Sequence, residues 1–276
     1  MRADGKRVTN VDNMYTLSPY FMVDRCDACN YITVKIPYEP VHKYILKMRK
    51  NGYKFSHMSL ILAAYVRAVS MFPEVNRFVV NKKIYARNEL TVAMVVQRAE
   101  DAEGTMSKIK FELTDTIFDV SKKVDEFVEG NREENSNSTD KIMSFLTKFP
   151  PVINFATSLL RWADKHGLLP KAIIDMSPFH ESMVISNLAS IRTGSIYHHI
   201  YNFGTVGQII TMGVLESMPK KVGDEIVNEK YIPLGIACDE RIASGHLYSK
   251  VFHVIEHYLK NPELLELPPE KVVYDK

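Results

Sequence analysis

The stretch from Tyr231 to Leu259 constrains the fold more than any other part of the chain. An apolar run, Ile232 to Cys238, is followed at once by three charged residues, Asp239-Glu240-Arg241. A small-residue turn, Ala243-Ser244-Gly245, then opens an amphipathic helix. This order predicts a buried strand, a tight polar corner and a helix. Ionisable side chains at the end of a buried strand are costly unless they are paired, so functional sites are often built at such corners.

The rest of the chain mixes strand and helix patterns without strict alternation. Period-two alternation predicts a strand over residues 32–36, and helical spacing predicts helices over 41–50 and 56–72. We also expect a hairpin at 78–85, strands at 90–96, 105–111, 183–186 and 209–215, a helix beginning at 115 or 116, and a charged hairpin around residue 223. The sequence therefore predicts one α+β domain over residues 1–276, with a mixed sheet covered by helices on one face.

Residues 141–170 form the most apolar insertion in the chain. The pattern predicts two helical segments separated by Pro150-Pro151. Arg161, Asp164 and Lys165 interrupt the apolar run, which argues against a membrane span. A helix pair lying at a membrane interface is the alternative. We expect these segments to pack on the domain instead.

Charge and targeting signals narrow the class of protein. The formal net charge is +2, and basic and acidic residues are interspersed, so no basic tract predicts a nucleic-acid partner. The N-terminal sequence has no apolar core typical of a signal peptide. We therefore expect a cytoplasmic enzyme scaffold of bacterial type. The three cysteines cannot all pair and the context is not secretory, so we expect reduced thiols.

Few short motifs indicate a metal or nucleotide site. Cys26-Asp-Ala-Cys29 has the spacing of half a zinc site, but no second ligand pair follows at a recognised spacing, so we expect no metal. The adjacent His198-His199 would diverge in a helix or a strand and chelate poorly. Glycine-rich dinucleotide and phosphate-binding motifs and the nucleophile-elbow motif are absent from the sequence.

Three segments resemble the catalytic domain of the dihydrolipoamide acyltransferases of 2-oxoacid dehydrogenase complexes. The family motif reads roughly Pro-Leu-x-Leu-Ser-x-Asp-His-Arg-x-x-Asp-Gly, and Pro233, Leu234, Asp239, Arg241 and Gly245 match it here. The segments Val184-Ile185-Ser186-Asn187-Leu188 and Phe72-Pro73-Glu74-Val75-Asn76 resemble two further family sequences. Together they span most of residues 15–265 in the family's order.

The resemblance implies a fold, a partner and a chemistry. It implies the two-layer sandwich that these enzymes share with chloramphenicol acetyltransferases, and a homotrimer with active sites between subunits. It implies acyl-coenzyme A as cosubstrate and a small hydroxyl, amine or thiol acceptor, without a lipoyl group. It assigns Ser186 as the hydroxyl that donates to the oxyanion of the tetrahedral intermediate. The sequence carries no recognisable lipoyl or subunit-binding domain, so we expect a stand-alone protein.

Two positions depart from the family motif. Glu240 stands where the family has its histidine base, and Ser244 stands where it has an aspartate. Imidazole suits proton abstraction near neutral pH, whereas a carboxylate is a much weaker base unless burial raises its pKa. In chloramphenicol acetyltransferases the aspartate before the glycine of the motif pairs with an arginine near the N-terminus, and Arg25 is at a comparable place. With Ser244 in place of that aspartate, Arg25 would lose this partner. Glu240 could take over that pairing, and Asp239 and Arg241 are expected to fix the corner in either case.

These observations leave three hypotheses. The first is a stand-alone acyltransferase with Ser186 as oxyanion donor and Glu240 as an altered base, supported by Arg25, Asp239, Arg241, Ser244 and Gly245. The second is a non-catalytic trimeric descendant that binds coenzyme A or another ligand, or acts as a scaffold. The third, which the charges in the insertion disfavour, is a peripheral membrane protein.

Overall fold

The computed structural model describes residues 2–97, 104–133 and 150–275. Its strands are β1 (Gly5–Arg7), β2 (Cys29–Pro37), β3 (Arg77–Val80), β4 (Lys83–Arg87), β5 (Leu90–Gln97), β6 (Gly104–Phe111), β7 (Met183–Asn187), β8 (Gln208–Met212), β9 (Glu216–Val222) and β10 (Glu225–Asp239). Its α-helices are α1 (Asn13–Phe21), α2 (Tyr38–Lys50), α3 (His57–Met71), α4 (Ile117–Glu133), α6 (Pro150–His166), α7 (Lys171–Met176) and α8 (Gly245–Lys260). The expected helical segment at 141–149 lies outside the described residues.

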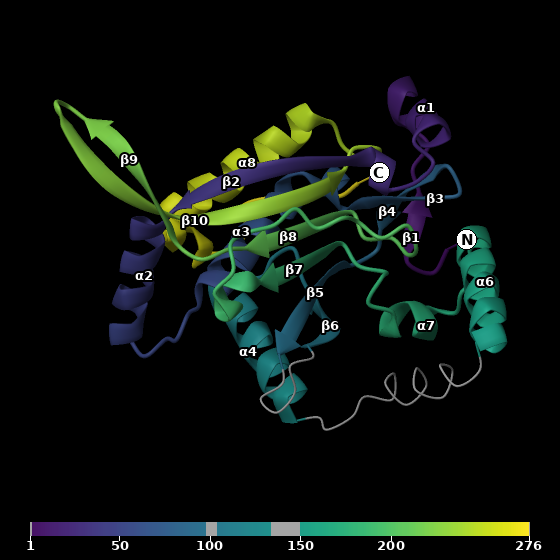
Figure 1. Cartoon of the computed structure of the whole chain (residues 1–276), viewed down its shortest axis with the longest axis horizontal. Helices are drawn as coiled ribbons and strands as arrows, with labels where there is room; N and C mark the ends of the chain where they lie inside the picture. Colours follow the sequence, from purple (N-terminus) through teal and green to yellow (C-terminus); the bar gives the residue numbers. More distant parts are fainter. Residues whose placement is uncertain (1, 98–103, 134–149, 276) are drawn as a thin grey trace.

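A seven-stranded mixed sheet is the framework of the molecule (Figure 1). Its order is β2-β10-β8-β7-β5-β6, with β9 paired to β10. β7 runs parallel to both β5 and β8, and the other pairs are antiparallel. A second, three-stranded sheet has the order β1-β4-β3. The α+β class predicted from the sequence is confirmed.

The main core lies between one face of the large sheet and the helices. α3 is buried along almost its whole length, because its sequence is apolar nearly all round, and Ser56 caps it by accepting a hydrogen bond from the Ser59 amide at 2.9 Å. Helices α2 and α8 pack beside α3. Ile185, Ile210 and Leu234 point into this core from three adjacent strands, so the alternate residues of those strands face the other side of the sheet.

An extended segment covers part of the opposite face. Residues 192–206 cross the sheet and bury a smaller cluster that includes Val184, Ile209 and Ala237. The approach is so close that a Cβ atom on Gly235 would lie 2.3 Å from the Ile196 carbonyl oxygen. This position therefore requires glycine.

β10 is longer than the sequence pattern suggested. The charged hairpin predicted around residue 223 is confirmed, but its second arm and the buried strand, which we predicted as separate, form one strand of 15 residues. Its first half pairs with β9 in an exposed hairpin that extends beyond the sheet, and its second half, from Tyr231, is buried between β2 and β8 (Figure 1). The chain therefore reaches the polar corner from a strand that is buried between two neighbours.

α6 contacts the domain differently from our expectation. The helix is confirmed, but Phe155, Leu159 and Trp162 are mostly exposed. The residue that ties α6 to the domain is Asp164, which is 5% exposed and bound by Arg2. A polar anchor replaces the predicted apolar packing in the residues that the structure describes.

Candidate functional site

Two buried arginines share one buried carboxylate at the corner after β10. Asp239 accepts hydrogen bonds from Arg241 Nε at 2.9 Å and Nη2 at 2.7 Å. Arg25 Nε lies 3.7 Å from the Asp239 Oδ2 atom. All three side chains are less than 5% exposed. Asp239 and Arg241 therefore fix the corner, as the sequence predicted.

Arg25 also connects two further segments to this corner. Its guanidinium donates to the carbonyl oxygens of Tyr201 at 3.1 Å, Asn202 at 3.4 Å and Val79 at 3.0 Å. Burial lowers the pKa of Arg25 to about 10, against the opposing charge of Asp239. Arg25 is thus held mainly by neutral carbonyl oxygens, and it shares its one carboxylate partner, Asp239, with Arg241.

Glu240 is the one member of the Asp239-Glu240-Arg241 trio that is not fully buried. Its amide donates to the Ala28 carbonyl oxygen at 2.9 Å, and its Oε2 atom accepts a hydrogen bond from Asn30 Nδ2 at 2.7 Å. The suggestion that Glu240 pairs with Arg25 is wrong. Neighbouring residues at the end of a strand point to opposite sides, so the side chain that reaches Arg25 belongs to Asp239.

Ser244 and Gly245 begin α8. The Ser244 hydroxyl accepts a hydrogen bond from the Leu247 amide at 3.2 Å and so caps the helix. It has no contact with Arg25 among the contacts in the described chain. Nothing lies within 4 Å of a Cβ built on Gly245, so no steric contact requires glycine there. The structure thus places both residues next to the corner without giving either a contact to the charged groups.

Ser186 lies far from Glu240 in one copy of the chain. Ser186 is paired with Thr211, and Thr211 is paired with Gly235. Asp239 lies four residues beyond Gly235, which is about 13 Å along the strand, and two strand spacings, about 10 Å, separate β7 from β10. Ser186 and Glu240 of a single copy therefore cannot contact the same small substrate.

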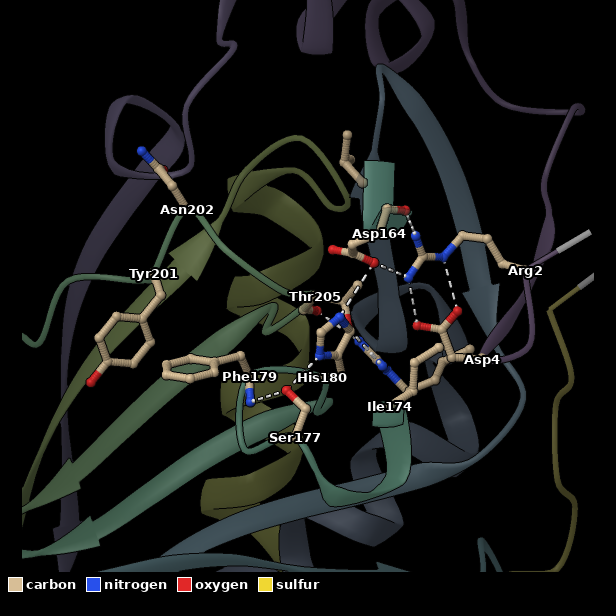
Figure 2. Close-up of polar contacts among 12 residues, drawn as sticks. Arg2, Asp4, Asp164, Ile174, Ser177, Phe179, His180, Tyr201, Asn202 and Thr205 are labelled. Carbon is tan, nitrogen blue, oxygen red and sulfur yellow. Dashed lines mark hydrogen bonds and ion pairs between the residues drawn. The ribbon is translucent and has the colours of Figure 1, made fainter. Parts of the chain in front are cut away.

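A buried polar cluster beside the corner was not predicted from the sequence (Figure 2). Asp164 Oδ1 lies 2.8 Å from Arg2 Nη2 and 3.3 Å from His180 Nε2, and His180 Nδ1 lies 2.7 Å from Ser177 Oγ. Burial alone would raise the pKa of Asp164, but the adjacent His180 imidazole and the charge of Arg2 outweigh it and lower the pKa. Arg2 and Asp164 are 162 positions apart, and no local motif marks such a pair.

The cluster has the composition of a serine–histidine–aspartate relay but not its accessibility. The His180 side chain is fully buried, so no substrate can reach the imidazole. Ser177 Oγ accepts from the Phe179 amide in the same turn at 3.3 Å. Arg2 binds both Asp164 and Asp4. The geometry is that of an anchor between α6 and the domain.

The cysteine and histidine motifs singled out in the sequence do not come together into a metal site in the described residues. Cys26, Cys29 and Cys238 are free thiols, and burial raises the pKa of Cys29 and Cys238. Within residues 2–97, 104–133 and 150–275, no group of three or more potential ligands could hold a metal ion. His198 and His199 stack on each other with ring centroids 4.7 Å apart. No helix in the described ranges is long and apolar enough to cross a membrane.

Comparison with known proteins gives a family match over part of the chain and a shared fold. Residues 178–267 match the model of the 2-oxoacid dehydrogenases acyltransferase (catalytic domain) family. A probable dihydrolipoamide acetyltransferase from Listeria monocytogenes 4b F2365 has 15% sequence identity and a TM-score of 0.59, with 93% of this chain and 95% of that chain covered. No curated protein matches the sequence.

Two further structures share the fold. The dihydrolipoamide acetyltransferase of Azotobacter vinelandii, which was solved to investigate a serine, a histidine and an asparagine in the catalytic mechanism, has 12% identity, 94% coverage of both chains and a TM-score of 0.61. A chloramphenicol acetyltransferase has 11% identity, covers 92% of this chain and 99% of its own, and has a TM-score of 0.56. The chain is therefore similar in the sequence of residues 178–267 to the 2-oxoacid dehydrogenase acyltransferase catalytic domain, and it has the chloramphenicol acetyltransferase-like fold.

Proposed function

We propose that this protein transfers an acyl group from acyl-coenzyme A to a small hydroxyl, amine or thiol acceptor. The observation that carries the proposal is the difference in burial and pairing among the three charged residues at the corner. Asp239 and Arg241 are buried and form hydrogen bonds with each other, whereas the carboxylate of Glu240 between them is partly exposed. The family match over residues 178–267 supports acyl transfer as the reaction class.

In the proposed reaction Glu240 is the base. The acceptor heteroatom attacks the thioester carbonyl carbon while its proton passes to the Glu240 carboxylate. The Asn30 amide, 2.7 Å from Oε2, orients that carboxylate and leaves Oε1 for the acceptor. The tetrahedral intermediate then collapses, the bond from carbon to sulfur breaks, and the coenzyme A thiolate takes the proton back from Glu240.

The site requires a second copy of the chain. Ser186 and Glu240 of one copy are too far apart to share a substrate, as the strand register indicates. Ser186 of a partner subunit would donate its hydroxyl hydrogen to the oxyanion, and loss of such a donor costs about a hundredfold or more in rate. A closed homotrimer provides three equivalent sites of this kind. Coverage by the partner would also desolvate Glu240 and strengthen it as a base.

Release of free thiol from acetyl-coenzyme A in the presence of a panel of small acceptors tests the proposal. We expect turnover in the intact protein and its loss in Glu240→Gln. The control is Glu39→Gln, an exposed carboxylate on α2 remote from the corner, which should retain full turnover. Unchanged turnover in Glu240→Gln would remove Glu240 from the mechanism. A thermal shift with acetyl-coenzyme A but no turnover with any acceptor would favour the non-catalytic alternative.

A further inference from the structure

A small cavity with an excess of positive charge lies behind the corner, away from Glu240. Its volume is about 270 Å³, and α1, the turn between β3 and β4, α6 and residues 202–204 enclose it. Five cationic side chains line it, namely Arg25, Lys82, Arg161, Lys165 and Arg241, but only two carboxylates, Asp24 and Asp164. Its volume is below the range of about 300–1,000 Å³ typical of drug-sized ligand sites, so a small anionic group fits it better than a whole cofactor.

The buried part of the lining supplies charge that the protein does not neutralise. Arg25 and Arg241 share Asp239 as their carboxylate partner. Arg25 Nε is buried and has no hydrogen-bond acceptor within the described part of the chain. Asp164 is bound by Arg2, which does not line the cavity and which also pairs with Asp4 (Figure 2). An anion in the cavity would lower the cost of keeping two guanidinium groups out of water.

The mouth of the cavity supplies free donors. Lys82, Arg161 and Lys165 are exposed, and no carboxylate lies within ion-pair distance of them among the residues with described positions. Arg161 and Lys165 lie four residues apart and so share one face of α6. Lys82 reaches the cavity from the turn between β3 and β4 and lies 4.7 Å from the Tyr20 ring centroid. Three cations from two separate elements thus converge on one opening.

Another cavity provides the contrast. Beneath the β9–β10 hairpin lies a cavity of about 760 Å³ that is also lined by several lysines. Lys43, Lys220 and Lys260 there each have a carboxylate partner, at 3.2 Å, 3.0 Å and 2.7 Å. Those cations are neutralised within the protein. The cavity behind the corner is therefore distinguished by unpaired charge and not by lysine content alone.

We infer that this cavity binds a phosphate group. A phosphate dianion matches the excess of positive charge, and lysine ammonium groups with an arginine fork are suited to its oxygens. The phosphate can belong to a soluble phosphate monoester or to the headgroup of an anionic lipid. The exposed apolar side chains of Phe155, Leu159 and Trp162 on the same helix as Arg161 and Lys165 give reason to test the lipid source.

Titration calorimetry with inorganic phosphate and with glycerol 3-phosphate tests the inference on the intact protein. We expect a Kd of about 1 mM or tighter, and binding at least about tenfold weaker in the triple variant Lys82→Ala, Arg161→Ala, Lys165→Ala. The matched control is Lys43→Ala, Lys220→Ala, Lys260→Ala, which removes the same charge from the other cavity and should bind like the native protein. The substituted side chains of both variants are solvent-accessible, and circular dichroism melts check their folding.

Flotation with phosphatidylcholine vesicles containing one fifth phosphatidic acid distinguishes the two sources. Flotation of the native protein that is lost in the first triple variant identifies the lipid headgroup. Binding of glycerol 3-phosphate without flotation identifies a soluble phosphate compound. Absence of phosphate and glycerol 3-phosphate binding, or equal weakening in both triple variants, overturns the inference. Neither measurement depends on acyl transfer, so failure of the phosphate site and failure of the proposed function at Glu240 can be distinguished.

Discussion

Arg25 Nε and Asp239 Oδ2 lie 3.7 Å apart in a buried pair, and the same carboxylate is bound by Arg241 at 2.7 Å. One carboxylate thus holds together the N-terminal segment, the end of β10 and the start of the turn to α8. Glu240 is positioned by this arrangement, because its own backbone lies between the two residues that are fixed. The geometry of the candidate base follows from its neighbours and not from its own side-chain contacts alone.

Asp239→Asn should destabilise the protein by about 3–5 kcal/mol, because it leaves two buried guanidinium groups without their carboxylate. Urea denaturation followed by circular dichroism measures this change. Asp24→Asn removes an exposed carboxylate close by and should change stability by less than about 0.5 kcal/mol. A similar small change in both variants would show that the corner does not depend on Asp239.

Ser244→Ala should cost about 1 kcal/mol, because the hydroxyl is the N-terminal cap of α8. Ser244→Asp, which restores the residue of the family motif, should keep the stability, since aspartate also caps helices well. Thermal unfolding compares the two. If the alanine variant is as stable as the native protein, the capping role assigned to Ser244 is refuted.

Tyr65→Phe should leave stability unchanged or raise it by up to about 1 kcal/mol. The Tyr65 hydroxyl is buried in α3, has no hydrogen-bond partner in the described residues, and its pKa is raised by desolvation. Removal of an unsatisfied buried polar atom relieves a desolvation cost. A loss of more than about 1 kcal/mol in chemical denaturation would reveal a partner for this hydroxyl.

Asp164 should make the protein sensitive to acid. The pKa of Asp164 is lowered in the folded state, so the unfolded chain binds its proton first as the pH falls. Its stabilising contribution is complete above the unfolded pKa of about 3.9 and is lost as the pH falls through the folded value. Asp164→Asn should therefore be less stable than the native protein at pH 6, and the difference should shrink below pH 4.

The control for that series is Asp175→Asn, which removes a half-exposed pair with Lys171. Exposed pairs contribute little, so this variant should follow the native protein at every pH. A stability difference between Asp164→Asn and the native protein that stays constant from pH 6 to pH 2 would contradict the lowered pKa.

Local patterns in the sequence predicted the elements better than their contacts. β2 and α8 follow from periodicity, because one face of each is buried against a neighbouring layer, whereas α3 follows from its nearly continuous apolar sequence. The length of β10 was missed, since its first half is exposed and pairs only with β9. A strand without a buried face has no apolar alternation to reveal it.

The sequence predicted which residues meet at the candidate site, but not which of them contact each other. The sequence showed that Asp239, Glu240 and Arg241 meet at a corner, but the side of the strand on which each lies depends on register. Asn30, the partner of Glu240, is 210 positions away and belongs to no motif. Contacts of that kind are set by the tertiary fold, so one sequence alone cannot assign them.

Subunit complementation tests the central claim most directly. Glu240→Gln and Ser186→Ala are each expected to be inactive or nearly so in acetyl-coenzyme A turnover, because each lacks one half of every site. When the two variants are co-expressed in equal amounts, random assembly of a closed trimer should restore both native residues at roughly a quarter of the interfaces, and turnover should return to about a quarter of the native rate. Mixed assemblies no more active than the separate variants would contradict a site shared between copies of the chain.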